Sequence, residues 1–271
     1  MKNVSPVRLL CPGCKKGLLA FDPATVDSVR CPECNSSYPV QNRIIDLVPE
    51  YSYQCTLAQA AMEWEPIIRL YESRLIRRSP YFAFFAGISF DNELKMVMDA
   101  AKLIGTEKLL DLACGPGNYS RPFARKLIGG KVVGLDLSMP MLNHATLKAQ
   151  AEGIENLCLI HGSALDLPFP EREFDAANCC GALHLFPDLN RALSEIYRVL
   201  TPGGRFTAAT FRMTGSGKLS KRVAQWRHKK VGIKQFLPGE LEALFNQAGF
   251  TNIQNLHSIR YWTILSATKP D

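Results

Sequence analysis

The chain has 271 residues, of which 46% are hydrophobic and 21% are charged. This composition is typical of a folded globular protein and excludes the disordered and collagen-like classes. No segment carries the roughly 20 consecutive apolar residues that a membrane-spanning helix needs, and residues 1–10 lack the apolar stretch of a signal peptide. We therefore expect no membrane span and a cytoplasmic location. The net charge of +7 permits an anionic partner such as RNA without requiring one.

Two Cys-Pro-x-Cys turns mark residues 1–50, which we expect to form a small unit of their own. Cys11 and Cys14 in the first turn, and Cys31 and Cys34 in the second, have the spacing of a four-thiolate zinc site. Free or disulfide-linked cysteines are the alternative, but disulfides are rare in cytosolic proteins. Four thiolates fill the coordination sphere of zinc, so we expect a structural Zn²⁺ that stabilises a unit too small to fold on its own core.

The pattern of residues 51–105 predicts a helical cap or linker. Pro66 is expected to begin one helix, and Asp91 is expected to cap a second helix whose apolar face includes Val97. Between them lies the aromatic run 81–85. These rings either line an apolar substrate pocket or pack the cap on the rest of the protein, and we favour packing.

Residues 106–271 alternate short apolar runs with helical patterns. We predict strands over 108–112, 131–135, 157–161, 174–179 and 205–210, helices over 189–200 and 237–248, and two short strands at the end. This alternation is typical of a parallel sheet with helices on both faces. The sequence therefore predicts an α/β, Rossmann-like domain over these residues.

A glycine-containing loop follows the first predicted strand, and Asp111 lies near the end of that strand. Gly115 and Gly117 let the backbone approach a ligand closely, and Asp136 ends the next strand, where an acid can accept from both hydroxyls of a ribose. A dinucleotide-binding loop would have a third glycine where this chain has Ser120, which argues against NAD. S-adenosylmethionine has no phosphate and carries a cationic amino group, for which Asp111 is a suitable partner.

Four motifs together resemble the UbiE-like class I S-adenosylmethionine-dependent methyltransferases over about residues 108–211. They are Asp-x-x-x-Gly-x-Gly at 111–117, Gly-Leu-Asp-Leu-Ser at 134–138, Leu-Pro-Phe-Pro with Phe-Asp at 167–175, and Leu-Thr-Pro-Gly-Gly at 200–204. The stretch 64–79 and Gly-Ala-Leu-His at 181–184 are similar to the plant and bacterial branch that joins a short ribbon to this core. The resemblance implies a methyltransferase with a Rossmann-like sheet.

The same resemblance implies where the cofactor binds. It places Asp111 near the methionine end, Asp136 on the ribose and Leu137 against the adenine. The full expected set is Asp111, Ala113, Gly115, Gly117, Asp136, Leu137, Ser163, Ala164 and Cys179. Two positions depart from the family pattern. Ala113 replaces the usual first glycine, a change that a methyl group tolerates if the local φ angle is negative, and Ser163 replaces an acid that commonly accepts from the adenine amino group.

The cysteine segment also resembles zinc-binding modules of known families. With Tyr-Pro-Val at 38–40 and Ile-Ile-Asp-Leu-Val-Pro at 44–49, it resembles the Trm112-type zinc ribbon, whose members are partner subunits of methyltransferases. It is also similar to the ribbon that opens the RlmA-type 23S rRNA guanine methyltransferases. Either resemblance implies a module that docks a partner or presents the substrate.

Methyl transfer from a sulfonium mainly requires alignment of the reacting atoms, and in some cases removal of a proton. His184, shortly after the fourth strand, is the candidate general base, with a packed or hydrogen-bonded histidine as the alternative. Cys179 and Cys180 could attack a pyrimidine ring. They lack the Pro-Cys setting of the RNA family that does so, and we favour apolar packing for both.

The segment from Lys218 to Lys234 combines seven Lys and Arg residues with Trp226, which suits either an RNA contact or a solvated helix face. We therefore consider three functions. Methyl transfer to a small, ring-containing or lipophilic metabolite is the leading prediction. The others are methyl transfer to rRNA or tRNA and a non-catalytic adaptor that binds the cofactor, and the oligomeric state is left open.

Overall fold

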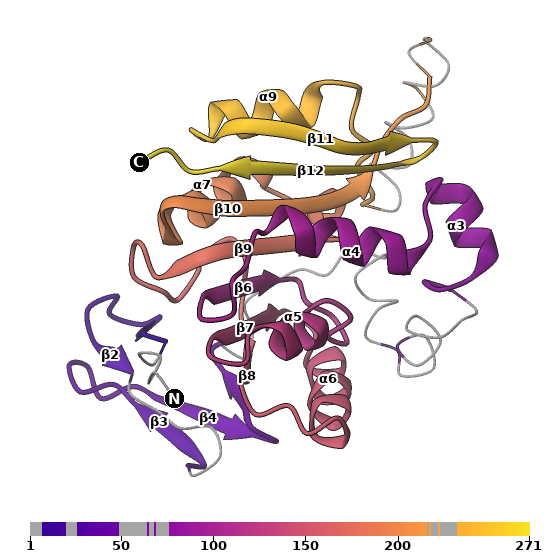
Figure 1. The fold of residues 1–271 in the computed structure, drawn as a ribbon. Helices are drawn as coiled ribbons and strands as arrows, with labels where there is room; N and C mark the ends of the chain where they lie inside the picture. The colour runs from indigo at the N-terminus through magenta and orange to yellow at the C-terminus, as the bar shows by residue number, and fades with distance from the viewer. Residues whose placement is uncertain are drawn as a thin grey trace.

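The computed structural model describes residues 7–19, 26–48, 64, 68, 76–215, 217, 222 and 232–271. A ten-stranded sheet forms the centre of this part of the chain (Figure 1). From one edge to the other its strands are β11 (Thr251–Ile259), β12 (Trp262–Thr268), β10 (Leu200–Phe211), β9 (Phe174–Cys180), β6 (Lys108–Leu112), β7 (Lys131–Asp136), β8 (Leu157–His161), β5 (Ile44–Asp46), β4 (Ser37–Gln41) and β3 (Ser28–Arg30).

The middle of the sheet is parallel. Each neighbouring pair from β10 through β9, β6, β7 and β8 to β5 runs in parallel, whereas β12 is antiparallel to both β10 and β11. These strands are short apolar runs that can be buried on both faces, and Leu109, Leu110 and Leu112 of β6 are fully buried. Because parallel strands end at the same edge, the residues that follow β6, β7, β8 and β9 meet there.

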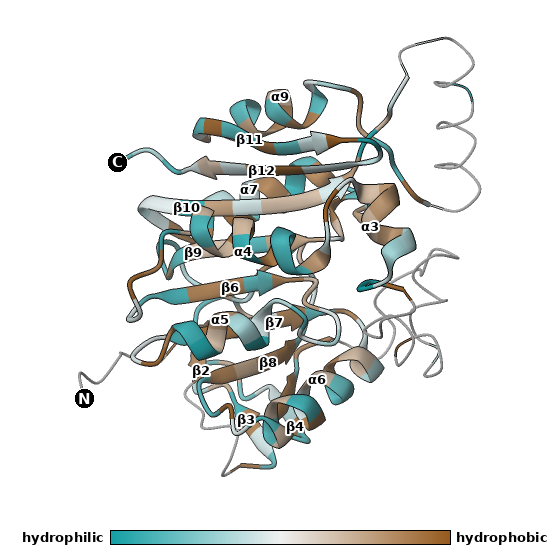
Figure 2. Cartoon of the chain, turned by 45° about the vertical axis from the view of Figure 1, so that its right-hand side comes forward, coloured by the Kyte–Doolittle hydropathy of each residue, from teal (hydrophilic) through white to brown (hydrophobic). Residues whose placement is uncertain are grey.

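Helices cover both faces of the sheet, as predicted. They are α3 (Pro80–Ala86), α4 (Phe90–Ala100), α5 (Ser120–Lys126), α6 (Met139–Ala151), α7 (Leu189–Val199) and α9 (Glu240–Gln247). One apolar cluster joins α3, α4 and α5 to Leu109 and Val132, and another joins α7 and α9 to Leu110 and Val133. Neighbouring strand residues thus face opposite layers, as the two-residue period of a strand requires. Figure 2 shows mostly hydrophobic colours along the inner strands, whereas the helices outside them carry both hydrophilic and hydrophobic colours.

Most predicted strand bounds are confirmed. β6 and β8 have the predicted bounds, and β7 and β9 each extend one residue further. β10 begins at Leu200 instead of Arg205, and its register with β9 is irregular between these two residues. The Thr-Pro-Gly-Gly turn that ends α7 is therefore part of the same extended element.

The cap of α4 differs from the prediction. The Ser89 hydroxyl accepts a hydrogen bond from the Asn92 backbone N–H at 3.3 Å, so Ser89 is the N-cap and Asp91 lies inside the first turn. An acid in the first turn still interacts favourably with the helix dipole, which is why the sequence suggests either position. The aromatic run 81–85 lies in α3, and Pro66 is outside the described residues.

The cysteine segment continues into the central sheet. β1 (Leu9–Leu10) pairs with β2 (Leu18–Leu19), β3 and β4 form a hairpin, and β5 lies between β4 and β8 (Figure 1). Ile45 of β5 is opposite Ile160 of β8, and both belong to the same apolar cluster. The domain boundaries at residues 50 and 105 stay predictions. None of the helices described is long and apolar enough to cross a bilayer.

Candidate active site and cysteine cluster

The loop after β6 leads directly into α5. Gly115 and Gly117 have φ angles of 54° and 78°, in the left-handed region that favours glycine. Ala113 has a φ angle of 48°, so the negative angle at which a methyl group is tolerated without strain is not found. An alanine in this region costs roughly 1 kcal/mol of backbone strain. The loop therefore holds Ala113 in a conformation that explains why glycine is usual at this position.

Gly134 and Gly115 show how closely the loop is packed on each of its two sides. A Cβ atom added to Gly134 of β7 would lie 2.8 Å from Leu159 Cδ2 and 2.9 Å from Cys114 Sγ. A Cβ atom added to Gly115 would meet no protein atom within 4 Å. The loop is thus packed tightly against β7 behind, while open space lies beside Gly115 for a ligand to approach the backbone.

Asp111 is a buried acid with fixed hydrogen-bond donors. Its side chain is 1% exposed, Oδ2 accepts from the Ser120 hydroxyl at 2.5 Å, and Oδ1 accepts from the Asn178 amide at 2.6 Å. Burial raises the pKa of Asp111 from 3.8 to about 6, and the nearby charge of Asp136 adds to this rise. The two donors oppose the rise, because they stabilise the ionised form. The carboxylate is therefore strongly influenced by any cation placed beside it.

Asp136 ties the end of β7 to the glycine loop. Its Oδ2 accepts from the Gly115 backbone N–H at 2.7 Å, and its Oδ1 accepts from the Ser138 N–H at 2.8 Å. Burial raises the pKa of Asp136, while the backbone donors and the charge of His161 oppose the rise. Each carboxylate oxygen can accept a second hydrogen bond, so both keep a lone pair for the hydroxyls of a ligand.

The remaining cofactor candidates lie at the neighbouring strand ends. The carbonyl of Leu137, which follows β7, accepts from His161 Nε2 at 2.9 Å. Ser163 is in the loop after β8, where its hydroxyl accepts from the Leu165 N–H at 3.2 Å, and Ala164 is buried. Because β7 and β8 are adjacent, Leu137 and this loop share one edge of the sheet. The structure thus brings the predicted set to the ends of four adjacent strands, β9, β6, β7 and β8.

Cys179 and Cys180 end β9. Cys179 is fully buried within an apolar cluster, and burial raises the pKa of its thiol well above the usual range. Burial does the same for Cys180, whose Sγ donates to the Asn178 side-chain oxygen at 3.1 Å. A thiol that stays protonated is a poor nucleophile, which supports the packing interpretation of both residues.

His184 lies in the short turn η1 (Leu183–Leu185) and is 5% exposed. Its Nδ1 is 3.1 Å from the Thr210 hydroxyl, and its ring meets Phe211 edge-on at 4.5 Å between centroids. Burial lowers the pKa of His184 from 6.5 to about 3, so the imidazole is neutral and weakly basic. These contacts support the packed alternative, and a role as general base stays a prediction.

Aromatic side chains gather beside η1 and the end of β10. Phe85 of α3 stacks on Tyr261 at 4.6 Å and meets Phe211 edge-on at 6.0 Å. The inner side of α3 therefore packs on the sheet, as predicted. Tyr81 and Phe84, on the outer side of α3, are 79% and 68% exposed.

A buried polar cluster beside the glycine loop was not predicted. Arg77 Nη2 lies 2.7 Å from Glu93 Oε1, to which the Tyr119 hydroxyl also donates at 2.5 Å. All three residues are at most 5% exposed, and Tyr119 is the N-cap residue of α5. One signal was available, because Glu93 lies four residues before Val97 on the apolar face of α4, where a charge needs a buried partner.

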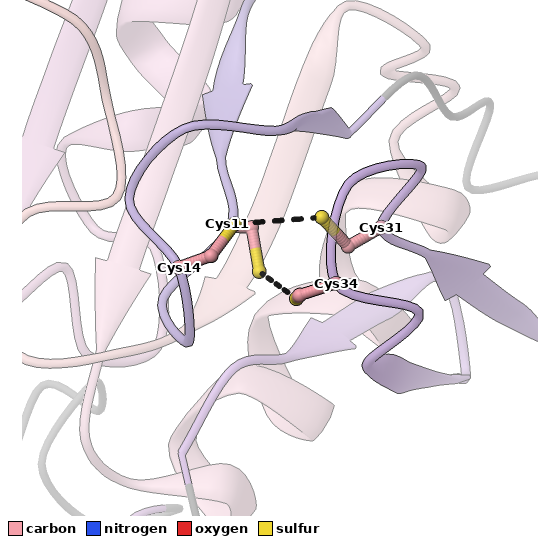
Figure 3. A group of neighbouring side chains, drawn as sticks. All are labelled: Cys11, Cys14, Cys31 and Cys34. Atoms are coloured by element: carbon pink, nitrogen blue, oxygen red, sulfur yellow. Dashed lines mark hydrogen bonds between the residues drawn. The ribbon is translucent and has the colours of Figure 1, made fainter.

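The four predicted metal ligands come together (Figure 3). The sulfur atoms of Cys11, Cys14, Cys31 and Cys34 all lie within 4.8 Å of one another, with Cys11 and Cys34 at 3.6 Å and Cys14 and Cys31 at 3.7 Å. Four thiolates at about 2.3 Å from a tetrahedral zinc ion lie about 3.8 Å apart. A Cβ atom on Gly17 would collide with the Cys31 sulfur, so the turn requires a glycine there. The geometry fits a four-thiolate metal site.

Most of the basic segment 218–234, including Trp226, lies outside the described residues. Lys234 is described, and its Nζ pairs with Glu240 Oε1 at 2.9 Å and lies over the Phe236 ring. This lysine therefore has partners within the fold, and the RNA-contact interpretation of the segment stays a prediction.

Comparison with known proteins agrees with this geometry. The family described as a methyltransferase domain matches residues 109–204. A demethylmenaquinone methyltransferase of Thermus thermophilus is 38% identical over 187 residues, which cover 60% of this chain and 84% of the relative. An uncharacterized chloroplastic methyltransferase of Arabidopsis thaliana is 30% identical over 283 residues, covering 97% of this chain and 79% of the relative. The structure of Haemonchus contortus phosphoethanolamine N-methyltransferase 2 with S-adenosyl-L-methionine has a TM-score of 0.64 at 17% identity, covering 83% of this chain and 62% of that one.

A glycine loop between two strand-end acids on a Rossmann-like sheet is the arrangement of a nucleoside-binding enzyme. Together with these matches it shows that the chain belongs to the S-adenosylmethionine-dependent methyltransferases. Among its relatives are the demethylmenaquinone methyltransferases, as the UbiE-like resemblance implied. The bacterial relatives match about 60% of the chain, whereas the Arabidopsis relative matches nearly all of it, the cysteine segment included.

Proposed function

We propose that this chain transfers a methyl group from S-adenosylmethionine to a small, lipophilic, ring-containing metabolite of the quinone type. The observation that carries this proposal is the 38% identity to a demethylmenaquinone methyltransferase across 84% of that protein. The aromatic side chains beside η1 and the end of β10 add support, because flat apolar rings pack well on one another.

The proposed donor site lies at the ends of β6, β7 and β8. S-adenosylmethionine supplies a methyl group on a positively charged sulfur, which is already an activated leaving group. Asp111 favours the cationic methionine end, and Asp136 accepts hydrogen bonds from the ribose. Leu137 and Ala164 offer apolar contacts to the adenine, and Ser163 supplies a hydroxyl at its edge. With the leaving group activated, these residues mainly bind and orient the two substrates.

The proposed acceptor site lies beside β9 and β10. Phe85, Phe211 and Tyr261 provide an aromatic wall there, and His184 is neutral beside it. A neutral, apolar wall avoids the large cost of burying a charge next to a lipophilic ring. It also excludes water, which strengthens the electrostatic interaction of Asp111 with the donor.

We further propose that Cys11, Cys14, Cys31 and Cys34 hold one structural zinc ion. We expect about one zinc per chain by elemental analysis, and its loss in Cys34→Ser. Because metal binding supplies much of the folding free energy of a small four-thiolate unit, we expect Cys34→Ser to lower the melting temperature by about 5 °C or more. Cys158→Ser is the control, since Cys158 lies in β8 outside the cluster, and an unchanged zinc content in Cys34→Ser would contradict the assignment.

The methyl acceptor can be tested by incubating the full chain with radiolabelled S-adenosylmethionine and a cell extract. Separation into organic-soluble, RNA and protein fractions should place the label in the organic-soluble fraction. Label in RNA would favour the rRNA or tRNA alternative instead. Cofactor binding without label in any fraction would favour a non-catalytic adaptor. The cytoplasmic location stays a prediction.

A further inference from the structure

Three polar residues lie side by side across the ends of three neighbouring strands. Asp136 ends β7, His161 ends β8 and Asp46 ends β5, and the strand registers pair His161 with each of the other two. β5 belongs to the cysteine segment, so this row crosses from that segment to the proposed ribose site. The bacterial relatives match only about 60% of the chain. The role of the contacts between the cysteine segment and the core therefore has to be argued from the residues of this chain.

The side chain of His161 bridges the two parts. Its Nδ1 lies 2.7 Å from Asp46 Oδ1, and its Nε2 lies 2.9 Å from the Leu137 carbonyl oxygen. A carboxylate and a carbonyl are both acceptors, so the ring makes both hydrogen bonds when it carries a proton on each nitrogen. The His161 side chain is 11% exposed and that of Asp46 is 25% exposed, which protects both bonds from competition by water.

We propose that Asp46 and His161 are a positioning pair through which the cysteine segment fixes the nucleoside end of the donor site. Leu137 follows the ribose-binding Asp136, so a bond that holds the Leu137 carbonyl also fixes the path of the chain at both residues. This inference rests on the donor site proposed above. It adds that the site is incomplete without a residue from β5.

Two further observations support the proposal. The charge that a protonated His161 carries opposes the rise that burial causes in the pKa of Asp136, and so favours the ionised form that accepts best from hydroxyls. The cysteine segment also holds the loop after β8, because the Leu10 N–H donates to the Pro168 carbonyl at 2.9 Å and Lys15 pairs with Asp166 at 2.6 Å. That loop contains the proposed adenine contacts, so the segment contacts two sides of the nucleoside site.

The test compares two ligands by calorimetry with the full chain. S-adenosylhomocysteine contains both the nucleoside and the amino-acid end, whereas 5′-methylthioadenosine lacks the amino-acid end. We expect His161→Leu, which removes both hydrogen bonds, to weaken both ligands by about the same factor of ten. His161→Gln can still donate to the Leu137 carbonyl, and it should recover part of the affinity. The KM for S-adenosylmethionine should rise in parallel, with kcat changed less than about twofold.

A variant of Asp46, the partner of His161, and a matched control variant complete the test. Asp46→Asn should weaken both ligands, and its effect should not add to that of His161→Gln, because the two residues act as one unit. Asn42→Ala removes another contact between the cysteine segment and the core, the hydrogen bond from Asn42 to Asn143 at 2.9 Å. This contact does not touch Leu137, so the control should bind both ligands like the wild type.

The outcomes separate this inference from the proposed function. If Asp136→Ala abolishes binding of S-adenosylhomocysteine while the His161 and Asp46 variants bind like the wild type, the positioning pair is wrong and the donor site stands. If Asp136→Ala binds normally, the donor site itself is misplaced and both proposals fail. Should His161→Leu not fold, His161→Gln and Asp46→Asn decide the question in the same way.

Discussion

The two halves of the proposed site are built in different ways. At the ends of β6 and β7, buried carboxylates and backbone N–H groups come from residues that are close in sequence, such as Asp111 with Ser120 and Asp136 with Ser138. At the ends of β9 and β10, the wall is aromatic and is assembled from α3, β10 and the β11–β12 hairpin, with Phe85 stacked on Tyr261. A donor shared by a whole family can be bound by a local motif, whereas an acceptor wall built at long range is free to differ between relatives.

The largest effect is expected at the donor half. Asp136→Ala removes the proposed acceptor of the ribose hydroxyls and the partner of the Gly115 N–H. Charge-assisted hydrogen bonds contribute about 1.5–3 kcal/mol each, so we expect the affinity for S-adenosylhomocysteine to fall at least about hundredfold by calorimetry. Glu155→Ala changes an exposed acid at a distance from the loop and serves as the control. A loss of affinity smaller than tenfold would contradict the proposed difference between the donor half and the acceptor half of the site.

A second test concerns the stability cost of the buried acid. Because burial raises the pKa of Asp111 to about 6, the folded protein holds this proton more tightly than the unfolded chain. The stability that this proton contributes is present below about pH 4 and is lost as the pH rises through 6. Asp111→Asn should therefore gain about 2 kcal/mol in free energy of unfolding relative to the wild type between pH 4 and pH 7, measured by denaturant titration. It should also bind S-adenosylhomocysteine poorly, and an equal pH dependence of the two proteins would contradict this account.

A substitution in the acceptor half should weaken binding of the methyl acceptor and leave binding of the donor unchanged. Phe85→Leu keeps an apolar side chain but removes the ring contacts that hold Tyr261 and Phe211 in the proposed aromatic wall, worth about 0.5–1.5 kcal/mol each, so we expect the KM for the methyl acceptor to rise about tenfold. The affinity for S-adenosylhomocysteine should stay within about twofold. Leu147→Ala, an exposed apolar residue of α6, is the control. Equal losses for donor and acceptor would show that the two halves are not separate.

The smallest effect is expected for His184. Loss of a general base typically lowers the rate by about 10²–10⁴, but burial lowers the pKa of His184 to about 3 and leaves it weakly basic. We therefore expect His184→Gln, which can keep the hydrogen bond to Thr210, to lower kcat less than about tenfold. A hundredfold loss, with a normal affinity for S-adenosylhomocysteine, would instead assign the base to His184.

Local patterns predicted much of the fold and the strand ends at which the proposed donor site lies. The apolar runs of β6 and β8 have their predicted bounds, because a buried parallel strand requires a short apolar sequence. Asp111 and Asp136 lie at strand ends as expected. The four cysteines also meet as their spacing indicated. In each case the prediction depends on residue type and on spacing within a short stretch of the chain.

The errors have physical causes. Both Ser89 and Asp91 can cap a helix, and only the backbone geometry shows that the hydroxyl of Ser89 does so. Alanine avoids strain at position 113 only if its φ angle is negative, yet Ala113 lies in the left-handed region, where hydrogen bonds around the loop hold the backbone. A local preference of about 1 kcal/mol is outweighed when several contacts require another conformation.

The sequence by itself determined the class of enzyme, the strand ends that bear the acids and the set of cysteines that can bind zinc, since each depends on residue type and short spacing. Only the tertiary structure decided that β5 continues the central sheet, that His161 joins Asp46 to the Leu137 carbonyl, and that Arg77, Glu93 and Tyr119 share one buried cluster. These contacts join segments up to 115 residues apart. Such pairings depend on how strands and helices pack in three dimensions, and no short pattern in the chain identifies which residues are the partners.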